Sequence, residues 1–198
     1  MIDATAAPRI DTVCLRARLM RALSWLAVAL ALLGVPAARA QGVEVLALAA
    51  GRGDEAVELD FAVRFVLPPP VEDALRRGIP LHFAARATLL RSRWYWRDER
   101  VSRASRSWRL SYQPLTSAWR VAQGGLHQSY ESLSDALLAM SRASRWRIAD
   151  AHEIEPGKDY YVEFSWSLDT TQLPRPMQIG IGGQPDWALG VERTLRLN

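Results

Sequence analysis

The residues with the most distinctive chemistry lie between Arg91 and Arg109. This stretch holds seven arginines and four aromatic residues, Trp94, Tyr95, Trp96 and Trp108, but only two carboxylates. Arginines beside aromatic rings can bind carboxylates, glycans or a protein partner, because the rings supply apolar contact area and cation–π attraction. We therefore expect a candidate binding surface made of Arg93, Trp94, Trp96, Arg97, Asp98 and Glu99.

A purely structural interpretation competes with this hypothesis. Aromatic residues favour strands, so the tryptophans could pack in the core or at a sheet edge, with the arginines guarding that edge against aggregation. In a strand, Trp94 and Trp96 would share one face and Tyr95 the other. The strand propensity of the aromatic residues favours the packing interpretation over the binding surface.

Motifs for catalysis or metal binding are missing from the sequence. The three histidines, His82, His127 and His152, have no ligand-like spacing, and there is no G-x-S-x-G or P-loop pattern. The run Gly180–Gly183 lacks the last glycine of a dinucleotide fingerprint and is typical of a turn. The pairs Asp98/Glu99 and Glu153/Glu155 are adjacent in sequence only, which does not make a catalytic pair. We therefore predict a protein that is not an enzyme and that has no metal site or cofactor.

The elements that must position the surface are mainly strands. Apolar and polar residues alternate with period two along much of the chain. This pattern predicts strands at Val43–Ala49, Val57–Phe65, Ile79–Leu89, Trp108–Tyr112, Trp119–Val121, Tyr160–Leu168 and Trp187–Leu197. The fourth and fifth of these form a hairpin, and the even-numbered face of Tyr160–Leu168, with Trp166, should be buried.

Two short helices are expected between the strands. The first covers Val71–Arg77 after three prolines, and the second begins at Ser132, which with Asp135 resembles a capping box. The segment Thr170–Pro185 should be an irregular but ordered connection, anchored by Leu173, Met177 and Ile179. The predicted fold is an antiparallel β-sandwich-like single domain, mainly β, with two short helices.

Two arginines occupy positions where the alternation predicts burial. Arg106 shares the face of Trp108 and Leu110, and Arg193 interrupts the apolar phase of the last strand. A buried arginine needs a carboxylate or several carbonyls as partners. Asp169 is a candidate partner for Arg106.

The N-terminal residues have the three parts of a secretory signal peptide. Basic residues precede an apolar run, Ala22–Gly34, which is followed by Pro36 and Ala38-Arg39-Ala40. We expect initiation at Met20, cleavage after Ala40, and a periplasmic mature domain at 41–198. The run is too short to span ~30 Å of hydrocarbon as a helix, which argues against an uncleaved anchor.

The charge balance limits the partners expected for the mature domain, and the cysteine content bears on its disulfides. The leader holds five of the 25 basic and two of the 21 acidic residues, so 20 and 19 remain. This near balance argues against nucleic acid or an anionic membrane surface as a partner. With the leader cleaved, we expect no stable membrane insertion. The single cysteine, Cys14, lies in the leader, so no disulfide is expected.

Several phrases of the sequence together resemble the proteobacterial DUF4390 family. These phrases are Arg93–Glu99, Arg109–Tyr112 with Leu115–Thr116, Trp119–Val121, Ser132–Leu137 and Leu168–Pro176. The resemblance implies a small exported protein and brings no catalytic residues. It favours a protein-interaction accessory to an envelope-sensing or signalling membrane protein, with a membrane or periplasmic protein as partner. The alternatives are a small-ligand or glycan-binding module and, less favoured, a hydrolase with an unrecognised site.

Overall fold

The computed structural model describes residues 42–95, 97–181 and 183–197 of the 198-residue chain. The expected signal peptide and the start at Met20 lie outside the described residues, and so does Trp96. In the part of the chain that is described, no helix has the length and apolar character needed to cross a membrane.

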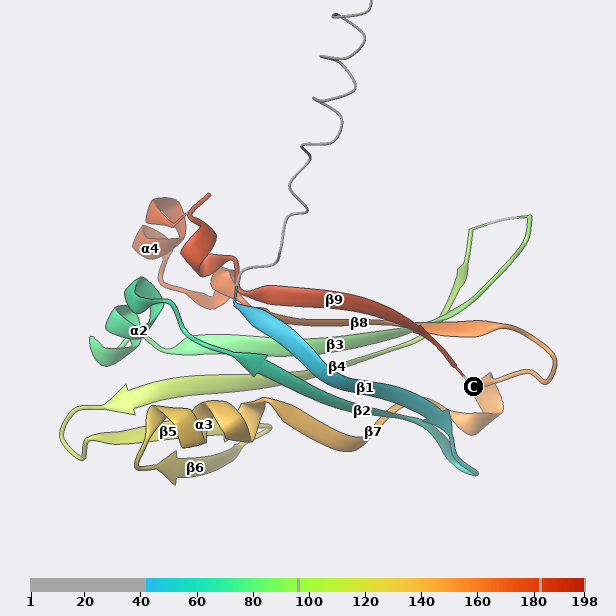
Figure 1. Ribbon diagram of the computed structural model, residues 1–198, viewed down its shortest axis with the longest axis horizontal. Helices are drawn as coiled ribbons and strands as arrows, with labels where there is room; N and C mark the ends of the chain where they lie inside the picture. Colours follow the sequence, from blue (N-terminus) through green and yellow to red (C-terminus); the bar gives the residue numbers. More distant parts are fainter. Residues whose placement is uncertain (1–41, 96, 182, 198) are drawn as a thin grey trace, which may run out of the picture. The chain divides into compact units, whose positions relative to one another are not determined.

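Two antiparallel sheets form the domain (Figure 1). The smaller sheet has the order β1-β2-β7, with β1 at Val43–Arg52, β2 at Ala56–Phe65 and β7 at Arg142–Asp150. The larger sheet has the order β6-β5-β4-β3-β8-β9. Its strands are β3 (Leu81–Arg91), β4 (Glu99–Gln113), β5 (Ala118–Gln123), β6 (Leu126–Tyr130), β8 (Tyr160–Leu168) and β9 (Gly190–Arg196). The predicted mainly-β, sandwich-like fold is confirmed.

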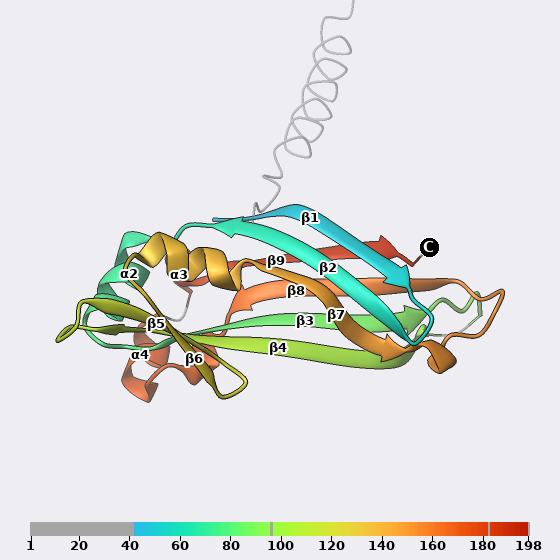
Figure 2. The same cartoon turned by 90° about the horizontal axis from the view of Figure 1, so that it is seen from below.

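The core lies between the two sheets, which stack as layers in Figures 1 and 2. Phe61 of β2 contacts Phe164 of β8 at a ring-centroid distance of 5.0 Å and Trp146 of β7 at 6.1 Å. The even-numbered residues of β8 are all buried, as the alternation predicted. Because the domain has no disulfide, its stability comes mainly from the burial of this apolar layer.

Both predicted helices are present. Helix α2 spans Pro69–Arg76 and helix α3 spans Leu133–Met140. The Ser132 hydroxyl accepts a hydrogen bond from the backbone N–H of Asp135, which satisfies one of the unpaired donors of the first turn. Ala136 and Met140 on α3 are buried, whereas Leu133 and Leu137 are half-buried.

The segment after β8 is more helical than predicted. It contains a third helix, α4 (Arg175–Gly180), and the 3₁₀ turns η2 (Thr170–Gln172) and η3 (Pro185–Trp187). Leu173 is buried and Met177 is half-buried, but Ile179 is 86% exposed, so its predicted anchoring role is wrong.

The period-two alternation of apolar and polar residues did not predict strands β6 and β7. Strand β6 is polar, and its residues Leu126–Ser129 are exposed. Strand β7 pairs with β2 through two register shifts, and Arg145 has a φ of 48°, so its alternation is broken. The last strand also begins later than predicted, at Gly190, because Trp187 belongs to the 3₁₀ turn η3.

The two arginines at apolar-phase positions make different contacts from those expected. The Arg106 guanidinium lies 5.3 Å from the ring centroid of Trp146, and partial burial lowers its pKa. Asp169 is not its partner: among the described residues no ion pair joins the two, and the Asp169 carboxylate accepts from the N–H and hydroxyl of Thr171. Arg193 has the predicted phase, but β9 is an edge strand and the side chain is exposed.

Candidate functional site

The candidate surface lies in a hairpin loop rather than on a strand. Strands β3 and β4 are paired from Leu81 opposite Leu110 as far as Arg91 opposite Glu99. Residues 92–95, 97 and 98 are the described part of the connecting loop, here called the hairpin tip, and Figure 1 shows it turned away from the two sheets. The predicted alternation of Trp94 and Tyr95 on two strand faces is wrong, because both residues lie in a turn.

The aromatic side chains of the hairpin tip face the solvent. Trp94 is 94% exposed and Tyr95 is 67% exposed, and their rings meet edge to face with centroids 5.1 Å apart. Trp108, in contrast, is buried in β4. The described aromatic residues of the Arg91–Arg109 stretch thus divide between an exposed tip and the core.

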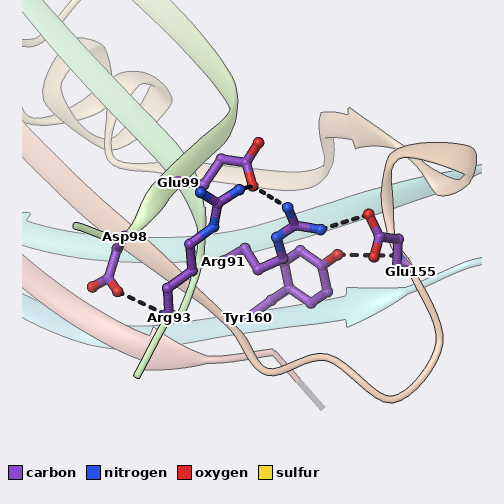
Figure 3. Close-up of polar contacts among 6 residues, drawn as sticks. All are labelled: Arg91, Arg93, Asp98, Glu99, Glu155 and Tyr160. Carbon is purple, nitrogen blue, oxygen red and sulfur yellow. Dashed lines mark hydrogen bonds and ion pairs between the residues drawn. The ribbon is translucent and has the colours of Figure 1, made fainter. Parts of the chain in front are cut away.

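An ion-pair network holds the base of the tip (Figure 3). The Glu99 carboxylate accepts from the guanidinium groups of both Arg91 and Arg93 through one oxygen, Oε2. Arg91 also donates through Nη1 to Oε1 of Glu155 at 2.5 Å. The network joins the last residue of β3, the tip, the first residue of β4 and the segment before β8.

Asp98 forms a second attachment of the tip. Its Oδ1 accepts from the backbone N–H of Arg93 at 3.1 Å, and its Oδ2 accepts from the Tyr161 hydroxyl of β8 at 2.6 Å. The neighbouring Tyr160 hydroxyl accepts from the backbone N–H of Glu155 at 3.0 Å. Both carboxylates of the candidate site therefore anchor the loop instead of facing a ligand.

The same contacts shift the pKa values of the anchoring groups. Hydrogen bonds from Tyr161 and from the Arg93 backbone lower the pKa of Asp98. Partial desolvation acts to raise the pKa of Glu99, but hydrogen bonds from Arg91 and Arg93 outweigh it, and the net pKa is lowered. The hydrogen bond to Asp98 raises the pKa of Tyr161 to about 12.

Anchoring of the tip should weaken in acid. A carboxylate whose pKa is lower in the folded state stabilises that state above its ordinary pKa, and this stabilisation is lost as the pH falls through the lowered value. We expect NMR titration of the Asp98 carboxyl carbon to give a midpoint below the ordinary aspartate value of about 3.9. Tyr161→Phe should move the midpoint upward, because it removes the strongest of the contacts that lower this pKa.

Tyr95→Phe is the matched control for Tyr161→Phe. It removes a tyrosine hydroxyl from the tip itself, whereas Tyr161 belongs to β8, and the hydrogen bonds of the tip described above do not involve Tyr95. Its Asp98 midpoint should equal that of the wild type. An unchanged midpoint in Tyr161→Phe would show that the Tyr161–Asp98 hydrogen bond does not form in solution.

Two exposed arginines follow the aromatic pair in the sequence. Arg97 lies in the tip and Arg100 at the start of β4, and among the described residues neither has an ion-pair partner within 4.0 Å. A loop that exposes indole and phenol rings, with unpaired arginines close by in the sequence, can bind apolar, aromatic or carboxylate groups of a partner. The structure thus brings together five of the six predicted site residues, and Trp96 lies outside its described part.

Groups that could perform catalysis are dispersed. His82 is in β3, His127 in β6 and His152 in the 3₁₀ turn η1 (Ala151–Glu153). Burial and the neighbouring Arg109 lower the pKa of His82. Across 42–95, 97–181 and 183–197, no group of three or more histidine, cysteine or carboxylate side chains is placed to hold a metal ion.

Sequence reasoning missed an apolar groove beside α3. The groove has a volume of about 410 Å³, and β2, the segment that follows it and α3 supply most of its lining, including Phe65, Leu67, Leu133 and Leu137. Leu46, Val66 and Leu138, which also line it, are more than half exposed. No sequence signal marks it, since its walls come from segments about 70 residues apart.

One comparison with known proteins gives a match. A family model described as "Domain of unknown function (DUF4390)" matches residues 40–196. No curated protein and no solved structure matches the chain.

Proposed function

The chain belongs to the DUF4390 family, as its sequence phrases predicted, and we propose that it is an exported, non-enzymatic domain that binds a partner protein through the hairpin tip. The observation that carries the proposal is the 94% exposure of Trp94 on an anchored loop. Tryptophan, tyrosine and arginine are the residues most enriched at the energetic centres of protein interfaces. The tip carries all three.

The anchoring of the tip supports this proposal. Binding by a mobile loop loses affinity, because ordering the loop costs conformational entropy. Here Asp98 and Glu99 tie the tip to β3 and β8 before any partner arrives. The backbone that carries the exposed rings is therefore attached near both ends of the tip, which lowers the entropy cost of binding a partner.

The compartment and the kind of partner follow from the sequence. The signal-peptide pattern of residues 20–40 supports export to the periplasm. The partner is then a membrane or periplasmic protein, and an accessory role beside an envelope-sensing or signalling membrane protein fits a small domain with one exposed recognition loop. A glycan could also stack on Trp94, and the experiment below distinguishes it.

Photo-crosslinking in intact cells tests the proposal. A photoreactive phenylalanine analogue replaces Tyr95 in the full-length chain, and we expect an ultraviolet-dependent adduct with a specific protein. The double variant Trp94→Ala/Arg97→Ala in the same background should lose the adduct, because truncation of interface hot spots costs ~2 kcal/mol or more of binding free energy. Its free energy of unfolding should change by less than ~0.5 kcal/mol, since both side chains are exposed. The adduct's mass should show a mature chain that begins at Gln41.

Leu115 supplies the matched control. It is a fully exposed apolar residue in the turn between β4 and β5 and takes the same photoreactive group. Equal adducts from positions 95 and 115, or an adduct that survives the double substitution, would refute binding through the tip. Saturable quenching of tryptophan fluorescence by oligosaccharides, without a protein adduct, would favour a glycan ligand instead.

A further inference from the structure

We propose that the binding surface continues from the hairpin tip along the outer face of the larger sheet, and that the partner segment it binds is acidic. This inference rests on the proposed function, because it names the chemistry of the same partner. It is carried by five arginines, here called the arginine track: Arg86, Arg100, Arg103, Arg109 and Arg120.

Strand pairing places the whole track on one face. In β3 the odd-numbered residues Phe83–Leu89 are buried, so the even-numbered ones, including Arg86, face outward. Arg100, Arg103 and Arg109 of β4 lie opposite the outward positions Leu90, Thr88 and His82. Arg120 of β5 lies opposite Ser111, two residues beyond Arg109 on β4.

The track is continuous with the hairpin tip. Tyr161 lies opposite Leu90, so it belongs to the same outer face, and its hydroxyl donates to Asp98 of the tip. Arg100 is two residues from Asp98. One partner segment can therefore contact Trp94 and then pass onto the sheet.

The arginines of the track form no close ion pairs in the described part of the domain. Among the described residues, none of the five has a carboxylate within 4.0 Å. Arg86 and Arg103 are diagonal neighbours on paired strands, because Arg86 lies opposite Ser105 and Arg103 lies opposite Thr88. Edge protection does not explain them, because β3, β4 and β5 are all interior strands of the sheet.

Small polar side chains form the surface between the arginines of the track. Ser105 lies opposite Arg86, and Ser107 follows on the same face of β4. On the other side of Arg86 lies Ser165 of β8. Small hydroxyl side chains leave the guanidinium groups accessible and add hydrogen-bond donors for carboxylate oxygens.

An acidic polypeptide fits this face better than an anionic membrane does. Glu163 of β8 and Glu192 of β9 lie on the same face beside the track, as the partners of Thr88 and Ser165 show. A flat anionic membrane would press on these glutamates as well as on the arginines. A polypeptide segment can lie over β3–β5 alone, and arginine binds carboxylates with two parallel hydrogen bonds.

Binding of poly-L-glutamate to the protein purified from the envelope tests the inference. Fluorescence anisotropy should show saturable binding that weakens when NaCl rises from about 50 to about 300 mM. The variant Arg86→Gln/Arg103→Gln/Arg109→Gln should lose affinity about tenfold, since it removes three carboxylate partners. The control Arg77→Gln/Arg142→Gln/Arg175→Gln removes the same charge from exposed sites elsewhere and should change affinity less than about twofold.

Three results would overturn the inference. The first is equal loss of affinity in both triple variants, which would mean that only the net charge matters. The second is poly-L-glutamate that does not bind the wild type. The third is track-dependent sedimentation with phosphatidylglycerol vesicles but not with phosphatidylcholine vesicles, which would assign the face to anionic lipid.

Two further measurements keep these outcomes interpretable. Both triple variants should melt no lower than the wild type, because removing unpaired like charges does not destabilise the fold. The crosslink from position 95 separates the two proposals. If it forms while poly-L-glutamate does not bind, only the acidic chemistry is wrong; if it does not form, binding through the tip is wrong whatever poly-L-glutamate does.

Discussion

Trp166→Ala should lower the free energy of unfolding by ~3–5 kcal/mol, the range typical of a buried aromatic residue truncated to alanine. Trp166 has no exposed surface. Its ring centroid lies 4.2 Å from that of Phe65 in the opposite sheet and 5.2 Å from that of Phe83 on the neighbouring strand. The substitution would remove the contacts with Phe65 and Phe83 and leave a cavity that the two packed sheets cannot close.

Urea denaturation of Trp166→Ala, Trp166→Phe and Trp94→Ala measures this effect. The indole N–H of Trp166 is buried, with no acceptor among the described residues, so phenylalanine removes an unpaired donor together with some volume. Trp166→Phe should therefore cost less than half as much as Trp166→Ala. Trp94→Ala should stay below ~0.5 kcal/mol, because its side chain is exposed. A loss below ~1 kcal/mol in Trp166→Ala would place this residue outside the core.

Phe61→Ala should destabilise the domain by a similar ~3–5 kcal/mol. Phe61 lies in β2, the central strand of the smaller sheet, and contacts Trp146 within that sheet. It also contacts Phe164 and Trp108 of the larger sheet, at centroid distances of 5.0 and 6.4 Å. Its truncation would remove the residue that these three aromatic side chains share as a neighbour.

The near-ultraviolet circular dichroism of the tryptophans gives a second measure of this change. Phe61→Ala should weaken the signal as well as the stability, because Trp146 and Trp108 lose a shared neighbour. Phe61→Leu is the conservative control and should cost less than ~1.5 kcal/mol, since it keeps most of the volume. Equal effects of alanine and leucine would argue against tight packing at this position.

The sequence by itself determined the features that depend on near neighbours. Alternation along Tyr160–Leu168 identified the buried face of β8, because successive side chains of a strand point to opposite faces whatever the strand pairs with. The sequence also predicted the start of α3, because the Ser132 cap and Asp135 are three residues apart. The mainly-β class followed from the same local patterns.

Strand pairing decided the parts that the sequence did not reveal. Strand β7 pairs with β2, and the register shifts in this pairing break the period-two alternation of apolar and polar residues by which a strand is predicted from sequence. Arg193 has the apolar phase, yet it is exposed because β9 pairs on one side only.

The candidate site depended even more on tertiary structure. Trp94 and Tyr95 have the composition of a strand, but pairing of β3 with β4 ends at Arg91 and Glu99 and leaves both residues in a loop. Arg91 and Glu155 are 64 residues apart, and only the folded sheet brings them to 2.5 Å. Local propensity reports which conformations a segment favours. Which side chains are exposed, and which charges remain unpaired, depends on where the rest of the chain packs.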